Sequence, residues 1–175
     1  MTEMEWLRGT NLTRMMQLVE DSLIDRKRRL HAVAACRSLW VQFPFDLFLE
    51  DINAAERYAD DSGTSRELEP EGECSLNWIF SIPAYESELQ ESSRFLRDIF
   101  GNPFRPIAFD PAWRSEAAVG IARGIYEDRA FERLPILADA LQDAGCEHPD
   151  ILSHCREPGD HVRGCWVVDL VLGKE

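Results

Sequence analysis

Residues 145–170, "GCEHPDILSHCREPGDHVRGCWVVDL", concentrate side chains that bind metals or carry thiol chemistry. Zinc prefers thiolate and imidazole ligands, four of them in a tetrahedron. Cys146, Cys155, His161 and Cys165 supply four such donors, so one hypothesis is a zinc site built from them. The spacing lacks the close Cys-x2-Cys pair of common structural zinc motifs. We therefore expect no cofactor and keep zinc as the alternative.

A catalytic hypothesis uses part of the same stretch. His161, Cys165 and Asp169 are each four residues apart, so a helix running through them would place all three on one face. They are the residue types of a general base, a thiol nucleophile and an orienting carboxylate. Cys-His-Asp sites usually gather from separate elements, because one helix seldom gives productive angles. We expect no catalytic residue here, with a metal- or thiol-dependent enzyme as the alternative.

A structural interpretation explains the same residues without chemistry. Asp169 lies within "CWVVDLVLG", where a buried carboxylate without a donor would be costly. We expect a polar tie between Asp169 and Arg163, with Arg156 or His161 as other donors. Cysteines in apolar helices usually act as small buried hydrophobes. On this interpretation residues 145–170 form a tightly packed helical corner.

Helical spacing of apolar residues dominates the chain and predicts the elements that position this corner. The fold class expected is all-α, a compact multi-helix orthogonal assembly forming a single domain over residues 1–175. The segment "CSLNWIFSIPAY" could add one short strand-like piece near Trp78. A short first helix is expected to start after Thr10 or Asn11. Further helices are expected to cover residues 25–43, 46–61, 86–100, 115–128, 131–145, 149–157 and 161–173.

Charge is uneven along the chain, whose formal net charge is −13. Residues 43–91 carry 2 basic and 13 acidic side chains, a balance of −11. Within them, residues 60–73 have almost no apolar side chain and several turn formers, so we expect an exposed acidic loop. An anionic protein is a poor ligand for duplex nucleic acid, because neutralising phosphates dominates that affinity. We expect no binding to duplex nucleic acid.

Residues 101–114, "GNPFRPIAFDPAWR", combine three prolines with three aromatic residues. One hypothesis is a rigid apolar connector that covers the core. The other is a partner-docking segment, with Phe104, Arg105 and Trp113 as the aromatic and arginine side chains that dominate many interfaces. Both hypotheses stay open. The remaining tryptophans are expected to anchor the core, and His31 to lie at the surface or its boundary.

Membrane and secretory classes do not fit the sequence. The apolar run from Trp166 to Leu172 is interrupted by Asp169 and is too short to span a bilayer. The beginning, "MTEMEWLRGT", is acidic and has no apolar signal region. Five cysteines are an odd number, which favours reduced thiols. We expect a cytoplasmic protein.

The order of "DRKRRLHAVAACRSLW", "LRDIFGNPFRPIAFDPAWR", "GIYEDRAFERLPILADALQDAGC" and "ILSHCREPGDHVRGCWVVDLVLGK" resembles a family of short, mostly helical proteins abundant in planctomycete genomes. The resemblance covers nearly the whole chain, is strongest from Leu96 onward and departs in the acidic middle. It implies a helical fold and a bacterial cytoplasmic setting, and it implies no established activity. The function expected is a non-enzymatic interaction or adaptor module whose partner is another protein.

Overall fold

The computed structural model describes residues 1–20, 25–42, 49–60 and 86–174. Within these ranges every regular element is a helix, which confirms the all-α prediction. The predicted acidic loop lies almost wholly outside the described residues, as does the strand-like segment near Trp78. The residues group into two compact units, 1–102 and 103–175, which are described separately below. The single domain and the orthogonal packing stay predictions.

The first helix, α1 (Glu3–Arg8), was not predicted. It begins with a capping box: the Thr2 hydroxyl accepts from the Glu5 backbone N–H at 3.2 Å, and the Glu5 carboxylate accepts from the Thr2 N–H at 2.7 Å. Trp6 on α1 is fully buried, and its indole N–H donates to the Gly101 carbonyl at 3.0 Å. The Thr-x-x-Glu pattern was therefore the local sequence signal for this helix.

Helix α2 (Leu12–Val19) packs against α6 (Glu86–Phe100). The side chain of Asn11 accepts from the Arg14 backbone N–H at 3.1 Å, so α2 begins at one of the two predicted caps. Gly101 has φ +66° directly after α6, which confirms the predicted stop. A buried apolar cluster in this unit consists of Trp6, Met15, Val19 and Leu96.

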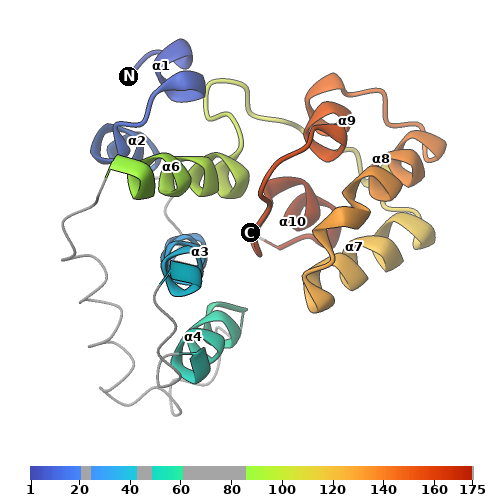
Figure 1. The fold of residues 1–175 in the computed structure, drawn as a ribbon. Coiled ribbons are helices and arrows are strands. Elements are labelled where there is room, and N and C mark those ends of the chain that lie inside the picture. Colours follow the sequence, from blue (N-terminus) through green and yellow to red (C-terminus); the bar gives the residue numbers. More distant parts are fainter. Residues whose placement is uncertain (21–24, 43–48, 61–85, 175) are drawn as a thin grey trace. The chain divides into compact units, whose positions relative to one another are not determined.

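Helices α3 (Asp25–Gln42) and α4 (Leu49–Asp60) lie side by side (Figure 1). Arg26 pairs with Asp60 at 3.1 Å, while Arg37, further along α3, contacts Glu56 at 3.2 Å. The later residue of α3 therefore contacts the earlier residue of α4, so the two helices are antiparallel. Glu56 is buried, and the Arg37 guanidinium offsets part of the cost of removing its carboxylate from water.

His31 on α3 is buried, with 4% of its surface exposed, so the prediction of a surface or boundary position was wrong. Its Nε2 lies 3.0 Å from the Ser92 carbonyl oxygen on α6, to which the ring N–H donates. Burial lowers the pKa of His31 below its usual 6.5; the hydrogen bond to Ser92, which raises the pKa, is the smaller influence. The folded protein therefore favours neutral His31.

The free energy of unfolding should fall as pH drops below 6.5, because unfolded His31 then takes up a proton that the folded protein resists. This contribution is complete above the unfolded pKa and is lost at up to about 1.4 kcal/mol per pH unit below it. His31→Gln, which keeps an N–H donor but does not titrate, should flatten the slope. Denaturant unfolding between pH 5 and 8 measures both proteins, and parallel pH profiles would contradict the prediction.

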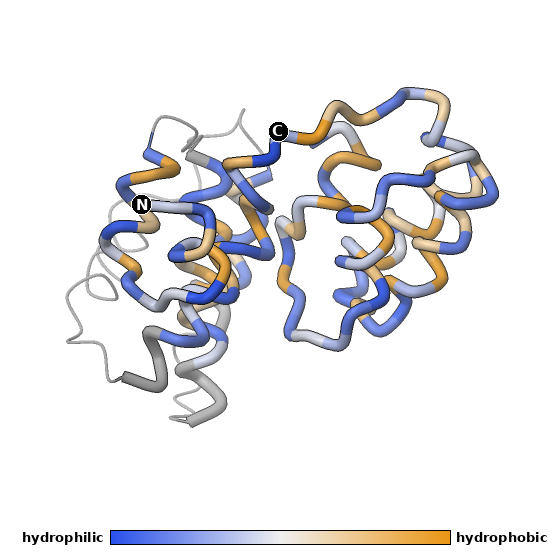
Figure 2. The backbone as a smooth tube through the Cα atoms, turned by 90° about the horizontal axis from the view of Figure 1, so that it is seen from above, coloured by the Kyte–Doolittle hydropathy of each residue, from blue (hydrophilic) through white to orange (hydrophobic). Residues whose placement is uncertain are grey.

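The second unit contains four α-helices: α7 (Glu116–Asp128), α8 (Leu134–Asp143), α9 (Pro149–Arg156) and α10 (Trp166–Leu172). A short 3₁₀ turn, η3 (Pro111–Trp113), precedes α7, and a second, η4 (Phe131–Arg133), lies between α7 and α8. Helix α7 contacts α8 and α10, and α9 contacts α8 and α10. Hydrophobic and hydrophilic residues are interspersed along the backbone (Figure 2). The apolar face of α8 is buried and consists of Leu134, Leu137, Ala138 and Leu141.

Helix α10 begins later than predicted, at Trp166 rather than His161. Gly164 has φ +96°, a left-handed conformation that interrupts helical geometry, and the Cys165 N–H donates to the Val162 carbonyl at 3.0 Å to close a turn. Cys165 is the N-cap of α10. His161, Cys165 and Asp169 therefore do not share one helix face, and that part of the catalytic hypothesis was wrong.

The tryptophans divide into two groups in the described part of the chain. Trp6 is fully buried, whereas Trp113 and Trp166 are half-buried against the core of the second unit. The side chain of Trp40 and all of Trp78 lie outside the described residues. None of the described helices combines the length and apolar character needed to cross a bilayer.

Candidate functional site

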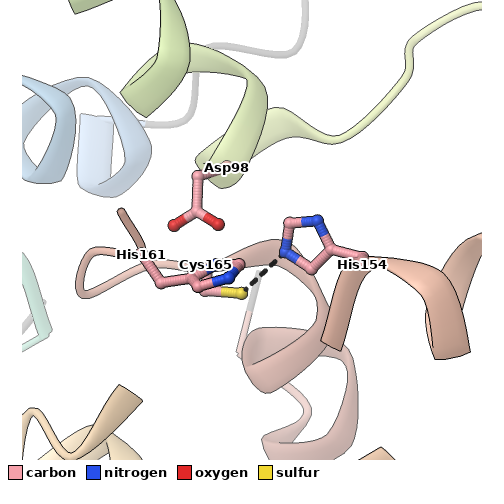
Figure 3. Close-up of side chains that lie close together, drawn as sticks. All are labelled: Asp98, His154, His161 and Cys165. Atoms are coloured by element: carbon pink, nitrogen blue, oxygen red, sulfur yellow. Dashed lines mark hydrogen bonds between the residues drawn. The ribbon is translucent and has the colours of Figure 1, made fainter. Parts of the chain in front are cut away.

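His154, His161 and Cys165 come together in the second unit (Figure 3), with one donor atom of each within 4.8 Å of the others. His154 lies in the last turn of α9, His161 in the connection that follows, and Cys165 at the N-cap of α10. Asp98, also labelled in Figure 3, belongs to α6 of the first unit and is not included in this cluster. We call these three residues the His-His-Cys cluster.

Local backbone geometry explains how one short connection brings these side chains together. Helix α9 ends where the Glu157 N–H donates to the Ser153 carbonyl at 2.8 Å, and Pro158-Gly159 follows. Proline cannot continue the helical hydrogen bonds, so the chain leaves the helix axis there. The tight turn at Gly164 then reverses the chain into α10. The start and the end of the connection are thereby brought close together.

His154 and Cys165 are in direct contact within the cluster. His154 Nε2 lies 3.2 Å from Cys165 Sγ, within the range for a hydrogen bond to sulfur. The rings of His154 and His161 meet edge to face, with centroids 4.9 Å apart and planes at 79°. The Trp166 ring centroid lies 5.0 Å from that of His154. Cys165 is fully buried, and both histidines are half-buried.

The zinc hypothesis named four ligands, of which two belong to the cluster. His161 and Cys165 do, whereas Cys146 and Cys155 are buried in the apolar core of the second unit and are not among its members. His154 takes their place and was missed as a ligand. The local pattern His-x6-His-x3-Cys around the Pro-Gly turn was the only signal for it, and residues 145–170 hold other combinations of the same residue types.

Burial limits the chemistry that Cys165 can perform. A nucleophilic thiolate must reach a substrate atom, and a side chain without exposed surface offers no such approach. The arrangement around Cys165 suits two roles that need no bulky substrate: a buried hydrogen-bonded pair, or ligation of a metal ion.

Asp169 is 2% exposed, as the structural interpretation requires, and it interacts with another group of the protein. Arg163, its expected donor, lies with its guanidinium carbon 4.5 Å from the ring centroid of Tyr126. Arg156, the second expected donor, binds Asp139 at 2.8 Å and Gln142 at 2.8 Å. The tie between Asp169 and Arg163 stays a prediction, while the burial that motivates it is observed.

The segment expected to dock a partner divides in two. Trp113 is half-buried and meets Phe109 edge to face, with ring centroids 5.3 Å apart. Arg114 lies over Phe109 and donates to the Leu170 carbonyl at 2.9 Å, so this end of the segment is fixed to the second unit. Phe104, which is 39% exposed, and Arg105 lie at the surface. The second half of the segment packs as the connector hypothesis expects, and partner docking by the first half stays a prediction.

Comparisons of this chain with protein-family models, with curated proteins and with solved structures found no match. Its function is therefore inferred from the side chains described above.

Proposed function

We propose that the protein is a non-enzymatic interaction or adaptor module of a bacterial cytoplasm, which contacts another protein through Phe104 and Arg105. The observation that carries the proposal is the exposure of both side chains on neighbouring, non-helical positions. Phe104 is the aromatic member of the four exposed large apolar side chains in the described part of the chain, and Arg105 follows it directly. Aromatic and arginine side chains supply a large share of binding energy in protein interfaces.

Contacts within each unit and two prolines lie close to this pair along the chain. Before it, the Asn102 side chain donates to the Glu3 carboxylate at 2.8 Å. After it, Ile107 and Phe109 pack against the core of the second unit. Pro103 and Pro106 flank the pair and fix their own φ angles. The prolines and the packing of Ile107 and Phe109 restrict the backbone that follows the pair, so less conformational entropy is lost there when a partner binds.

The competing function is a metal- or thiol-dependent enzyme that uses the His-His-Cys cluster. The 3.2 Å contact between His154 and Cys165 favours it. The complete burial of Cys165 weighs against its thiol branch, because a substrate would have to displace packed side chains. The interaction role needs no such rearrangement, since Phe104 and Arg105 already lie at the surface.

A photo-crosslinking amino acid at position 104 should give one discrete product with another protein in the cells that produce this chain. Arg105→Glu should reduce the yield, because it reverses the charge beside the crosslinker. Ile136, which is 55% exposed on α8, provides the matched control position and should give no discrete product. Equal products from positions 104 and 136, or a yield insensitive to Arg105→Glu, would contradict the proposal.

A further inference from the structure

We propose that His154, His161 and Cys165 bind one zinc ion, at a site separate from the docking segment. The three side chains offer two imidazole nitrogens and one sulfur, with donor atoms within 4.8 Å of one another. Nitrogen and sulfur donors of this kind select zinc over magnesium or calcium, which prefer oxygen. The spacing His-x6-His-x3-Cys gives one short stretch of chain all three ligands.

The distances fit a tetrahedral ion after small movements. Bonds of about 2.0–2.1 Å to nitrogen and about 2.3 Å to sulfur separate neighbouring donors by roughly 3.3–3.6 Å in a tetrahedron. His154 Nε2 and Cys165 Sγ are 3.2 Å apart, close to that separation. A hydrogen bond between the two would explain this one distance equally well. That bond would not need His161, whose donor atom lies within 4.8 Å of both and supplies the third ligand.

The surroundings suit a metal with three protein ligands. Cys165 is fully buried, which shelters a metal-bound thiolate from solvent and oxidants. The Trp166 ring, 5.0 Å from that of His154, contributes an apolar wall. Both histidines are half-buried, so each keeps some contact with solvent through which an ion can arrive. The fourth position of the tetrahedron is then left to water or to a small external ligand.

Zinc binding should be coupled to proton release and to stability. Cys165 must lose its proton to bind, so affinity should fall as pH falls. A ligand that binds only the folded protein raises its stability, and the melting temperature should therefore rise with zinc concentration. The site joins the end of α9 to the start of α10, so the second unit should be the part that zinc stabilises.

The test uses the full chain, stripped of metal by a chelator and titrated with zinc or with cobalt(II) as a spectroscopic substitute. We expect one ion per chain, a thiolate-to-cobalt charge-transfer band and the visible bands of a tetrahedral ion. Cys165→Ser, His161→Gln and His154→Gln should each weaken binding by more than the roughly 10- to 100-fold that loss of an outer-shell partner costs. Far-UV circular dichroism of each metal-free variant reports whether it is folded.

Cys155→Ala is the matched control, because Cys155 is a buried thiol next to His154 in the chain and lies outside the cluster. It should keep the charge-transfer band and the affinity, as should Cys146→Ala. If Cys165→Ser does not fold, the cobalt spectrum of the unaltered chain and the affinity of His161→Gln decide the question. Binding of no ion, a spectrum without the thiolate band, or wild-type affinity in His161→Gln would each overturn the proposal.

Discussion

Trp6→Ala should lower the free energy of unfolding of residues 1–102 by about 3–5 kcal/mol, the usual cost of removing a large buried aromatic side chain. Trp6 is fully buried in a small cluster with Met15, Val19 and Leu96, so few neighbours can collapse into the space it leaves. The variant also loses the hydrogen bond from the indole N–H to the Gly101 carbonyl. Denaturant unfolding followed by far-UV circular dichroism measures the change.

Leu7→Ala is the matched control, because Leu7 is the next residue on α1 and is 48% exposed. Its effect should be small. Trp6→Phe should fall between the two, since it keeps an aromatic ring in the cluster but leaves the Gly101 carbonyl without its indole donor. If Trp6→Ala and Leu7→Ala cost the same, the buried indole would not be what holds α1 against the rest of this unit.

Asp169→Ala should lower the stability of residues 103–175 by about 3–5 kcal/mol, the range observed when one partner of a buried charged pair is removed. The side chain is 2% exposed in an apolar helix, between the buried Val168 and the core-facing Val171. Its carboxylate therefore depends on interactions inside the protein, and the group that serves it would be left without a partner. Thermal and denaturant unfolding both report the loss.

Asp160→Ala is the control for this prediction. Asp160 follows the Pro158-Gly159 turn and is exposed, so its replacement should change stability little. Asp169→Asn separates charge from shape, because it keeps the size and hydrogen-bonding capacity of the side chain but removes the charge. Equal stability of Asp169→Ala and Asp160→Ala would show that the buried carboxylate is not a structural tie.

Short-range patterns predicted most of the helices, because caps and apolar spacing act within one or two turns of the chain. Asn11 and Ser115 begin α2 and α7 through side-chain hydrogen bonds to backbone N–H groups three residues ahead. The inward face of α8 followed from apolar positions spaced by three and four residues. Helix α1 was equally local, since its capping box joins Thr2 to Glu5. The capping box stands in the sequence, so α1 could have been predicted from it.

The start of α10 shows where local reasoning misleads. An apolar pattern continues from Val162 through Leu172, which favours a helix throughout, but Gly164 adopts φ +96° and delays its beginning to Trp166. A glycine reaches that conformation at little cost, so the sequence allows the helix and the turn alike. The turn removed the shared helix face on which the catalytic hypothesis depended.

The sequence by itself determined the helical class, most helix boundaries and the concentration of zinc-binding residue types in residues 145–170, because these depend on neighbours along the chain. Only the tertiary structure decided that His31 is buried, since its contact, Ser92, lies 61 residues away. Only the tertiary structure decided, too, that His154 and His161 approach Cys165 while Cys146 and Cys155 enter the core. Composition supplies the donor atoms, but the path of the connection between α9 and α10 selects which of them meet.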